Sequence, residues 1–175
     1  MKQSIPSWQI GGFVFVGALG TLLHFMFDWS GGSAFAALFS AVNESVWEHM
    51  KLLFYPMLLF AWWEWRVWGK GDSRFWCIKL MGVLLGLGLV PVVYYTYTGA
   101  LGLSVEWFNI TIFFIAAAVA LYMETRLFLR DGGCTLHGRM AVMGLVLIAV
   151  VFTVLTFATP RIPLCRDPIT GTYGY

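Results

Sequence analysis

Long apolar stretches, separated by short polar ones, divide the chain into five predicted membrane spans. Each is close to the roughly 20 residues that a helix needs to cross the hydrocarbon of a bilayer. The predicted spans are residues 8–29, 44–68, 75–97, 105–129 and 140–158. A tail rich in Pro and Gly, residues 159–175, follows them. Because no internal repeat or second domain is evident, we predict a single all-α domain over residues 1–175, a polytopic bundle of five transmembrane helices.

The apolar segment between the first two spans, residues 30–42, is too short to cross a membrane. Gly31 and Gly32 separate it from the first span. Two structures fit this segment: a helix or loop packed at the membrane interface, or a re-entrant segment that covers a cavity. Irregular backbone is tolerated at membrane depth only where protein buries it or where it lines water.

The second span carries a start signal and an internal proline. Ser45-x-x-Glu48 fits a capping box, in which each side chain bonds a free backbone N–H of the other residue. Pro56 removes one backbone N–H from the helix, so we predict a kink near Leu52.

Composition favours a membrane protein over a soluble one. Hydrophobic residues make up 59% of the chain and charged residues 11%, whereas soluble domains carry about 25% charged residues. The net charge of +2 is too small to indicate a nucleic-acid partner. The expected partner is therefore the lipid bilayer and not nucleic acid. A homo-oligomer or a larger membrane complex remains open.

Positive charges concentrate on one side of the predicted bundle. Cytoplasmic loops of membrane proteins carry an excess of Lys and Arg, so we predict that the N-terminus is cytoplasmic and that the tail lies outside. The cations on the predicted cytoplasmic side are Lys2, Arg66, Lys70, Arg74, Lys79, Arg126, Arg130 and Arg139. Those on the other side are Lys51, Arg161 and Arg166.

The same topology places Cys77 and Cys134 near the cytoplasmic face and Cys165 outside. None of them forms a CxxC pair. Because the cytoplasm keeps thiols reduced, we expect no structural disulfide.

The densest polar stretch of the chain is Asn43–Lys51, at the outer start of the second span. An ionisable side chain at membrane depth costs on the order of 3 kcal/mol, so such residues usually face a cavity and pair. His24 and Asp28, one turn apart at the end of the first span, should reach the same depth. The predicted outer polar set is His24, Asp28, Asn43, Glu44, Glu48, His49 and Lys51. Further candidates for it are Glu106, Asn109, Tyr94, Tyr95, Arg161 and Asp167.

Three functions fit this predicted outer polar set. In the first, it only ties helices together: Glu48 caps its helix, Lys51 pairs with Glu44 or Asp28, and the histidines donate to backbone carbonyls. In the second, His24, Asp28 and His49 bind zinc or another divalent metal, and Glu48 acts as the catalytic base of an intramembrane hydrolase.

In the third, the same side chains bind a small polar solute or a lipid headgroup, or relay protons. The residues that we expect to contact such a ligand are Asn43, Glu44, Lys51 and Glu106. The function classes left open are therefore an enzyme, a binding or transport protein, and a structural or accessory membrane subunit.

The charged residues near the cytoplasmic helix ends have a simpler interpretation. Glu64 and Glu124 should pair with their neighbours at the membrane interface, next to Arg66 and Arg126. Lys79 lies less than two turns inside its span and should extend to the near interface.

Three sequence strings mark a resemblance to a known family. They are His24-Phe25-Met26-Phe27-Asp28-Trp29-Ser30-Gly31, Asn43-Glu44-Ser45-Val46-Trp47-Glu48-His49-Met50-Lys51 and Asp167-Pro168-Ile169-Thr170-Gly171-Thr172-Tyr173-Gly174. Over nearly its whole length the chain resembles a family of small uncharacterised bacterial integral membrane proteins, a domain of unknown function. The resemblance implies five helices in a bacterial plasma membrane, and it does not indicate any particular activity.

A more distant similarity concerns the metal-ligand pattern. His24-x-x-x-Asp28 is similar to part of the zinc site of seven-helix ceramidase and adiponectin-receptor-like hydrolases. Those enzymes supply three histidine ligands, whereas this chain has two on the relevant side and five predicted helices.

Overall fold

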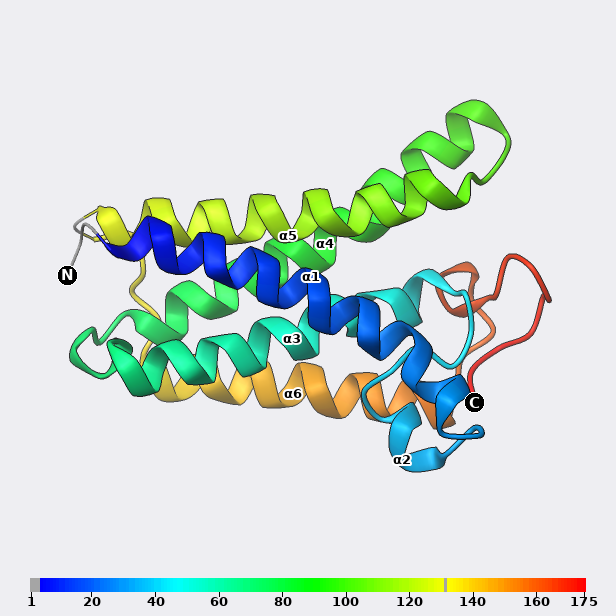
Figure 1. Cartoon of the computed structure of the whole chain (residues 1–175), viewed down its shortest axis with the longest axis horizontal. Helices are drawn as coiled ribbons and strands as arrows, with labels where there is room; N and C mark the ends of the chain where they lie inside the picture. Colours follow the sequence, from blue (N-terminus) through cyan, green and yellow to red (C-terminus); the bar gives the residue numbers. More distant parts are fainter. Residues whose placement is uncertain (1–3, 131) are drawn as a thin grey trace.

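The structure is a bundle of long helices that run side by side along one axis (Figure 1). It is a computed structural model that describes residues 4–130 and 132–175, so the predicted cytoplasmic cation Lys2 lies outside the described residues. The α-helices are α1 Ile5–Trp29, α2 Ala34–Ala37, α3 Val46–Val67, α4 Phe75–Leu101, α5 Glu106–Leu129 and α6 Gly138–Phe157. Two short 3₁₀ turns are η2 Gly69–Gly71 and η3 Pro163–Cys165. The predicted all-α fold is confirmed over this part of the chain.

Four of these helices, α1, α4, α5 and α6, are long and apolar enough to cross a membrane. Large apolar side chains cover their outer surfaces: Ile10, Val92 and Met143 are 68, 62 and 70% exposed. A soluble monomer rarely carries such continuous apolar surface, whereas lipid tails cover it in a membrane. Length, composition and outer surface thus agree with a multi-pass membrane protein.

The remaining long helix, α3, is the most enclosed one. It runs along the same axis as α1 and α6 (Figure 1) and packs against α1, α4, α5 and α6. Its core side chains, including Leu53, Phe54 and Phe60, are buried along its whole length. α3 buries three charged side chains, Glu48, Lys51 and Glu64, whereas α4 and α5 bury one each, Lys79 and Glu124. Neighbouring groups must compensate these charges.

Close packing between α1 and α3 depends on a proline and a glycine. Pro56 has no N–H to donate to the carbonyl of Leu52, one turn earlier in α3. That carbonyl oxygen faces Gly20 of α1, where an added Cβ would come within 2.8 Å of it. Only glycine leaves room for this approach, so the Leu52–Pro56 turn and Gly20 form one packing unit.

The segment between α1 and α3 packs at the end of the bundle. Its short helix α2 buries Ala36 and Ala37 and leaves Phe35 73% exposed. The alternative of an interfacial helix or loop fits this placement, since α2 lies beside the ends of the long helices (Figure 1).

Helix α4 is longer than the sequence pattern predicted. It continues through the expected turn at residues 98–104 as far as Leu101. Gly102 ends it in the left-handed conformation, with φ of 70°, which glycine adopts at little cost. The boundary prediction was therefore four residues short, because Thr98, Gly99 and Ala100 are small enough to be read as either a turn or a helix end.

A disulfide joins Cys77 of α4 to Cys134 in the loop between α5 and α6. The expectation of no disulfide is therefore wrong. That expectation rests on the reducing cytoplasm alone. The fold brings the start of α4 and the α5–α6 loop together at one end, with the Cα atoms of Cys77 and Cys134 6.1 Å apart, a distance that a disulfide can span. Cys165 is the free cysteine and is buried.

Glycines on α4 offer a matched test of this packing. An added Cβ at Gly82 would come 2.6 Å from Cγ and 2.7 Å from Cδ of Glu124, whereas one at Gly88 would meet nothing within 4 Å. Gly82→Ala should therefore lower stability by at least about 1 kcal/mol, and Gly88→Ala should change it by less than about 0.5 kcal/mol. Thermal unfolding in detergent measures both. Equal effects of the two substitutions would contradict the close approach of α4 and α5.

Candidate functional site

Two imidazoles and one carboxylate meet where α1 ends and α3 begins. Nε2 of His24 lies 3.8 Å from Oε1 of Glu44, and Nε2 of His49 lies 3.5 Å from Oε2 of the same carboxylate. The three candidate ligand atoms all lie within 4.8 Å of one another. Tetrahedral zinc with ligands at 2.0–2.1 Å separates them by about 3.3 Å, so a small contraction would bring this cluster to metal-binding geometry.

The environment of these side chains suits an accessible ligand site. The side chains of His24, His49 and Glu44 are 30, 28 and 43% exposed, so an ion can enter without unfolding the bundle. Nδ1 of His49 lies 2.9 Å from the carbonyl oxygen of Ser45, a contact in which Nδ1 donates its hydrogen. This bond leaves Nε2 with a free lone pair directed at the cluster, as in many metal-bound histidines.

Glu44 reaches the histidines because the helix starts after it. Ser45 caps α3, and its side chain accepts a hydrogen bond from the N–H of Glu48. The capping prediction is confirmed for Ser45, but the Glu48 carboxylate does not return the bond. It accepts instead from the N–H of Val42, at 3.1 Å.

The C-terminal tail holds the Asn43–Ser45 turn in place. The Asp167 carboxylate accepts the N–H of Glu44 at 3.4 Å and the N–H of Ile169 at 2.7 Å. Burial would raise the pKa of Asp167, but these amide hydrogen bonds and that of Thr170 stabilise the ionised form and hold the pKa below its usual value. Asn43 adds a bond from its side-chain amide to the carbonyl of Gly174, at 3.2 Å.

The last residue closes the same end of the bundle. The backbone N–H of Tyr175 donates to the carbonyl of Thr156 at 2.9 Å, and its hydroxyl donates to the carbonyl of Gly32 at 3.1 Å. The tail, α6, the α1–α2 turn and the start of α3 thus form one hydrogen-bonded unit around the cluster.

Glu48 and Lys51 form a buried ion pair next to this unit. Nζ of Lys51 lies 2.6 Å from Oε2 of Glu48, with the side chains 0 and 1% exposed. Lys51 also donates to the carbonyl of Ala37 at 2.8 Å and to the hydroxyl of Thr156 at 2.9 Å. That hydroxyl donates to Oε1 of Glu48 at 3.1 Å. These bonds fasten α2, α3 and α6 together and occupy both oxygens of the carboxylate.

The other residues of the predicted outer polar set have different locations. Asp28 is close enough to His24 for an electrostatic interaction but is not part of the three-residue cluster. Glu106 is exposed at the start of α5. Asn109 bonds to Tyr97 and Ser104, at the α4–α5 turn, which splays away from the end of α1 and from the tail (Figure 1). The fold therefore does not bring Glu106 or Asn109 to the histidines.

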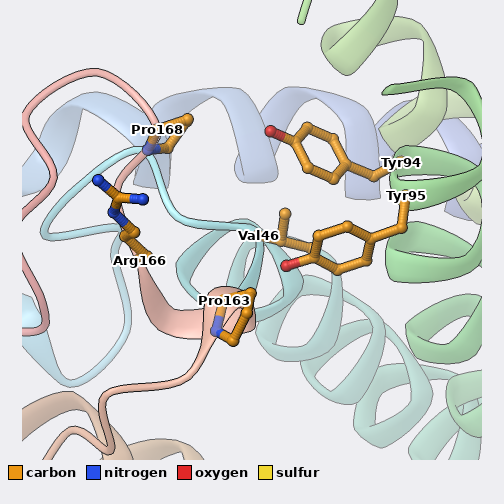
Figure 2. Close-up of a pocket in the computed structure, with 6 residues that line it drawn as sticks. All are labelled: Val46, Tyr94, Tyr95, Pro163, Arg166 and Pro168. Atoms are coloured by element: carbon orange, nitrogen blue, oxygen red, sulfur yellow. The ribbon is translucent and has the colours of Figure 1, made fainter. Parts of the chain in front are cut away.

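A cavity of about 310 Å³ lies between the start of α3, the end of α4 and the tail (Figure 2). Its lining residues are Val46, Tyr94, Tyr95, Pro163, Arg166 and Pro168. Both tyrosine rings reach from α4 toward the tail segments that carry Pro163 and Pro168 (Figure 2). An arginine and two tyrosines beside apolar rings suit a small anionic or polar group. Sequence reasoning named both tyrosines but not Arg166 as part of the outer site.

A second group of charges is buried in the other half of the bundle. Lys79 of α4 contacts Glu64 of α3 and lies 2.5 Å from Glu124 of α5. Both glutamates are fully buried and Lys79 is 2% exposed. Gln9 of α1 donates to Oε1 of Glu64 at 3.1 Å. The expectation that Glu64 and Glu124 pair at the membrane interface and that Lys79 extends to it was wrong, because the fold turns all three inward.

Comparison with known proteins gives a family and no activity. A model described as a family of unknown function (DUF6512) matches residues 1–175. No curated protein and no solved structure matches the chain.

The Glu48–Lys51 pair predicts a non-additive response to substitution. Lys51→Met leaves a buried carboxylate without its cation, and Glu48→Gln leaves a buried ammonium without its anion, so each should lower stability by about 3 kcal/mol. The double variant removes both charges and should be more stable than the sum of the two losses predicts. Thermal unfolding of the four proteins in detergent provides the cycle. Strictly additive losses would contradict a direct pair.

Proposed function

Since the chain belongs to DUF6512, a family of unknown function, we propose its function from the geometry of the site. The protein is a multi-pass membrane protein that binds a divalent metal ion, zinc or a similar one, through His24, Glu44 and His49. The observation that carries this proposal is the convergence of the three ligand atoms within 4.8 Å of one another, on residues from two different segments of the chain. Two imidazoles and a carboxylate are a ligand set that zinc and related ions bind well.

The site has the features of a reactive metal centre more than of a structural one. Structural zinc sites supply four protein ligands, whereas three protein ligands leave a position for water or substrate. A metal bound there would polarise a carbonyl or acidify its water, which is the chemistry of a hydrolase. Asp28 lies beside His24 and is the candidate for a fourth ligand or a base. Glu48, which the sequence suggested as the base, already has both oxygens engaged.

In this proposal the substrate binds in the cavity of about 310 Å³ beside the tail. The guanidinium of Arg166 would pair with a phosphate or carboxylate, and the rings of Tyr94 and Tyr95 would cover the apolar part of the ligand. A lipid headgroup or a small polar solute fits that description. Neither His24, Glu44 nor His49 is among the lining residues, so ligand and metal would occupy neighbouring sites.

We further propose that α3 is a fifth membrane crossing. The start of α1 and the tail lie at opposite ends of the bundle (Figure 1), which requires an odd number of crossings. α3 has 22 residues, enough to cross. Its charged side chains Glu48, Lys51 and Glu64 are paired inside the bundle, and Arg66 is exposed near its end. Four charged residues lower its hydropathy, and three of them are buried away from lipid.

The Lys and Arg distribution supports a cytoplasmic N-terminus and an outer tail, in a bacterial plasma membrane as the family resemblance implies. The disulfide bears on the same question, because it lies at the Lys- and Arg-rich end. Cytoplasmic thiol pools reduce disulfides. In this orientation the Cys77–Cys134 disulfide of the structure would face that thiol pool, which would reduce it to two thiols.

Metal content provides the main test. Purified without chelators and with zinc supplied, the wild-type protein should carry close to one metal ion per chain by elemental analysis. His24→Ala, His49→Ala and Glu44→Gln should each lose it, because two remaining ligands bind weakly.

The matched control for this test is His137→Ala, since His137 is exposed before α6 at the other end of the bundle. It should keep the metal. Wild-type protein without metal, or metal retained when either cluster histidine is removed, would overturn the proposal. If His49→Ala lowers only thermal stability and no metal was bound, the cluster ties helices together.

A second test addresses topology. Reporters fused after Tyr175 should be active only outside the cytoplasm, and a maleimide probe should label Cys134 in freshly lysed cells, because the reduced dithiol is expected there. A cytoplasmic reporter signal together with an unlabelled, disulfide-bonded Cys134 would reverse the orientation.

A further inference from the structure

The buried group Gln9–Glu64–Lys79–Glu124 differs from the Glu48–Lys51 pair in one respect: its formal charges do not balance. Glu48 and Lys51 bring one charge of each sign. Lys79 faces two carboxylates, Glu64 and Glu124, so full ionisation would leave one negative charge uncompensated. Burying an uncompensated charge among packed helices is strongly unfavourable.

Among residues 4–130 and 132–175, Lys79 is the cation that pairs with these two carboxylates. Rings of Phe60, Phe75 and Phe128 surround Nζ of Lys79 at 5.9, 5.7 and 5.6 Å. The arginines that follow the two glutamates on the same helices lie elsewhere. Arg66 sits over the ring of Trp62 and Arg126 over the ring of Tyr122.

Hydrogen bonding shows what is missing from the group. Three of its buried oxygens have no hydrogen-bond partner: Oε1 of Gln9, Oε2 of Glu64 and Oε1 of Glu124. Oε2 of Glu64 is compensated by its ion pair with Lys79. The other two, Oε1 of Gln9 and Oε1 of Glu124, have no donor in hydrogen-bonding geometry, although the Gln9 side chain interacts with Glu124 as well as Glu64. The group therefore lacks both one positive charge and one donor hydrogen.

One proton would supply both the missing positive charge and the missing donor hydrogen. We infer that the Gln9–Glu64–Lys79–Glu124 group is a proton-binding site that holds one exchangeable proton on its two carboxylates. A protonated carboxyl becomes an O–H donor, and its partner carboxylate remains ionised beside Lys79. A metal cation is a poorer occupant, because the ammonium already sits between the two carboxylates.

A path for the proton begins at a cavity of about 300 Å³ beside η2. Phe128 forms part of its wall, and the same ring lies 5.6 Å from Nζ of Lys79. Phe128 therefore adjoins both the cavity and the proton-binding site. Because the site joins α1, α3, α4 and α5, gain or loss of its proton changes the attraction among four helices, as in membrane proteins that couple protonation to movement.

Infrared difference spectroscopy of the purified protein tests this directly. At neutral pH the wild type should show the C=O stretch of a protonated carboxyl, with a small shift in D₂O. Glu64→Gln and Glu124→Gln should each abolish that band, because the remaining carboxylate alone balances Lys79. Lys79→Gln has the opposite effect: it leaves two buried carboxylates without a cation and should strengthen the band about twofold.

The matched control is Glu106→Gln, which removes an exposed carboxylate at the start of α5 and should leave the band unchanged. Circular dichroism confirms that each variant is folded. If Lys79→Gln does not fold, the test rests on Glu64→Gln and Glu124→Gln, because each replaces a carboxyl by a neutral group of the same shape. Absence of the band in the wild type, or its survival in both Glu64→Gln and Glu124→Gln, would overturn the proposal. Stability that depends on sodium in a protein lacking the band would identify a metal cation instead.

The rate at which the carboxyl band responds to pH tests the proposed proton path past Phe128. After a pH jump, the band should change faster in Phe128→Leu than in the wild type, because a smaller side chain opens the wall between cavity and site. An unchanged rate would contradict entry through this cavity.

Discussion

Charge burial is the constraint on which the bundle depends. A charged side chain that leaves water must find a partner of opposite sign, or the loss of hydration outweighs the packing gained. α3 carries such side chains near both of its ends, Lys51 and Glu64, and both are fully buried. Lys51 pairs with Glu48 and also donates to Thr156 of α6 and to the Ala37 carbonyl of α2. Glu64 pairs with Lys79 of α4 and accepts a hydrogen bond from Gln9 of α1. The positions of four surrounding elements are thereby fixed relative to α3.

The candidate metal site lies next to the buried Glu48–Lys51 pair, which leaves the exposed Glu44 carboxylate beside the two histidines. Lys51 pairs with Glu48 and not with the neighbouring Glu44, whose carboxylate lies beside His24 and His49. The tail reinforces this arrangement through the bond from Glu44 to Asp167. A buried ion-pair network and a partly exposed candidate ligand set therefore lie within one turn of each other in α3.

The two ends of the bundle offer different chemistry. One end combines exposed imidazoles with a cavity that contains Arg166, which suits a metal and an anionic or polar ligand. The other half encloses Lys79 between two carboxylates behind Phe128, which suits a proton. Both arrangements use α3, since it contributes His49 to the first and Glu64 to the second.

The sequence by itself determined the membrane class, the long helices and the Ser45 cap, because hydropathy, helix length and capping are local properties. It also brought His24 and His49 together through the antiparallel order of the first two helices. Only the tertiary structure decided which acidic residue joins them, since Glu44 precedes the helix and Glu48 turns inward to Lys51. It also decided that Glu64, Lys79 and Glu124 meet. The distance of a residue from a helix end gives its depth, but its rotation toward lipid or toward a neighbouring helix depends on packing between segments distant in the chain.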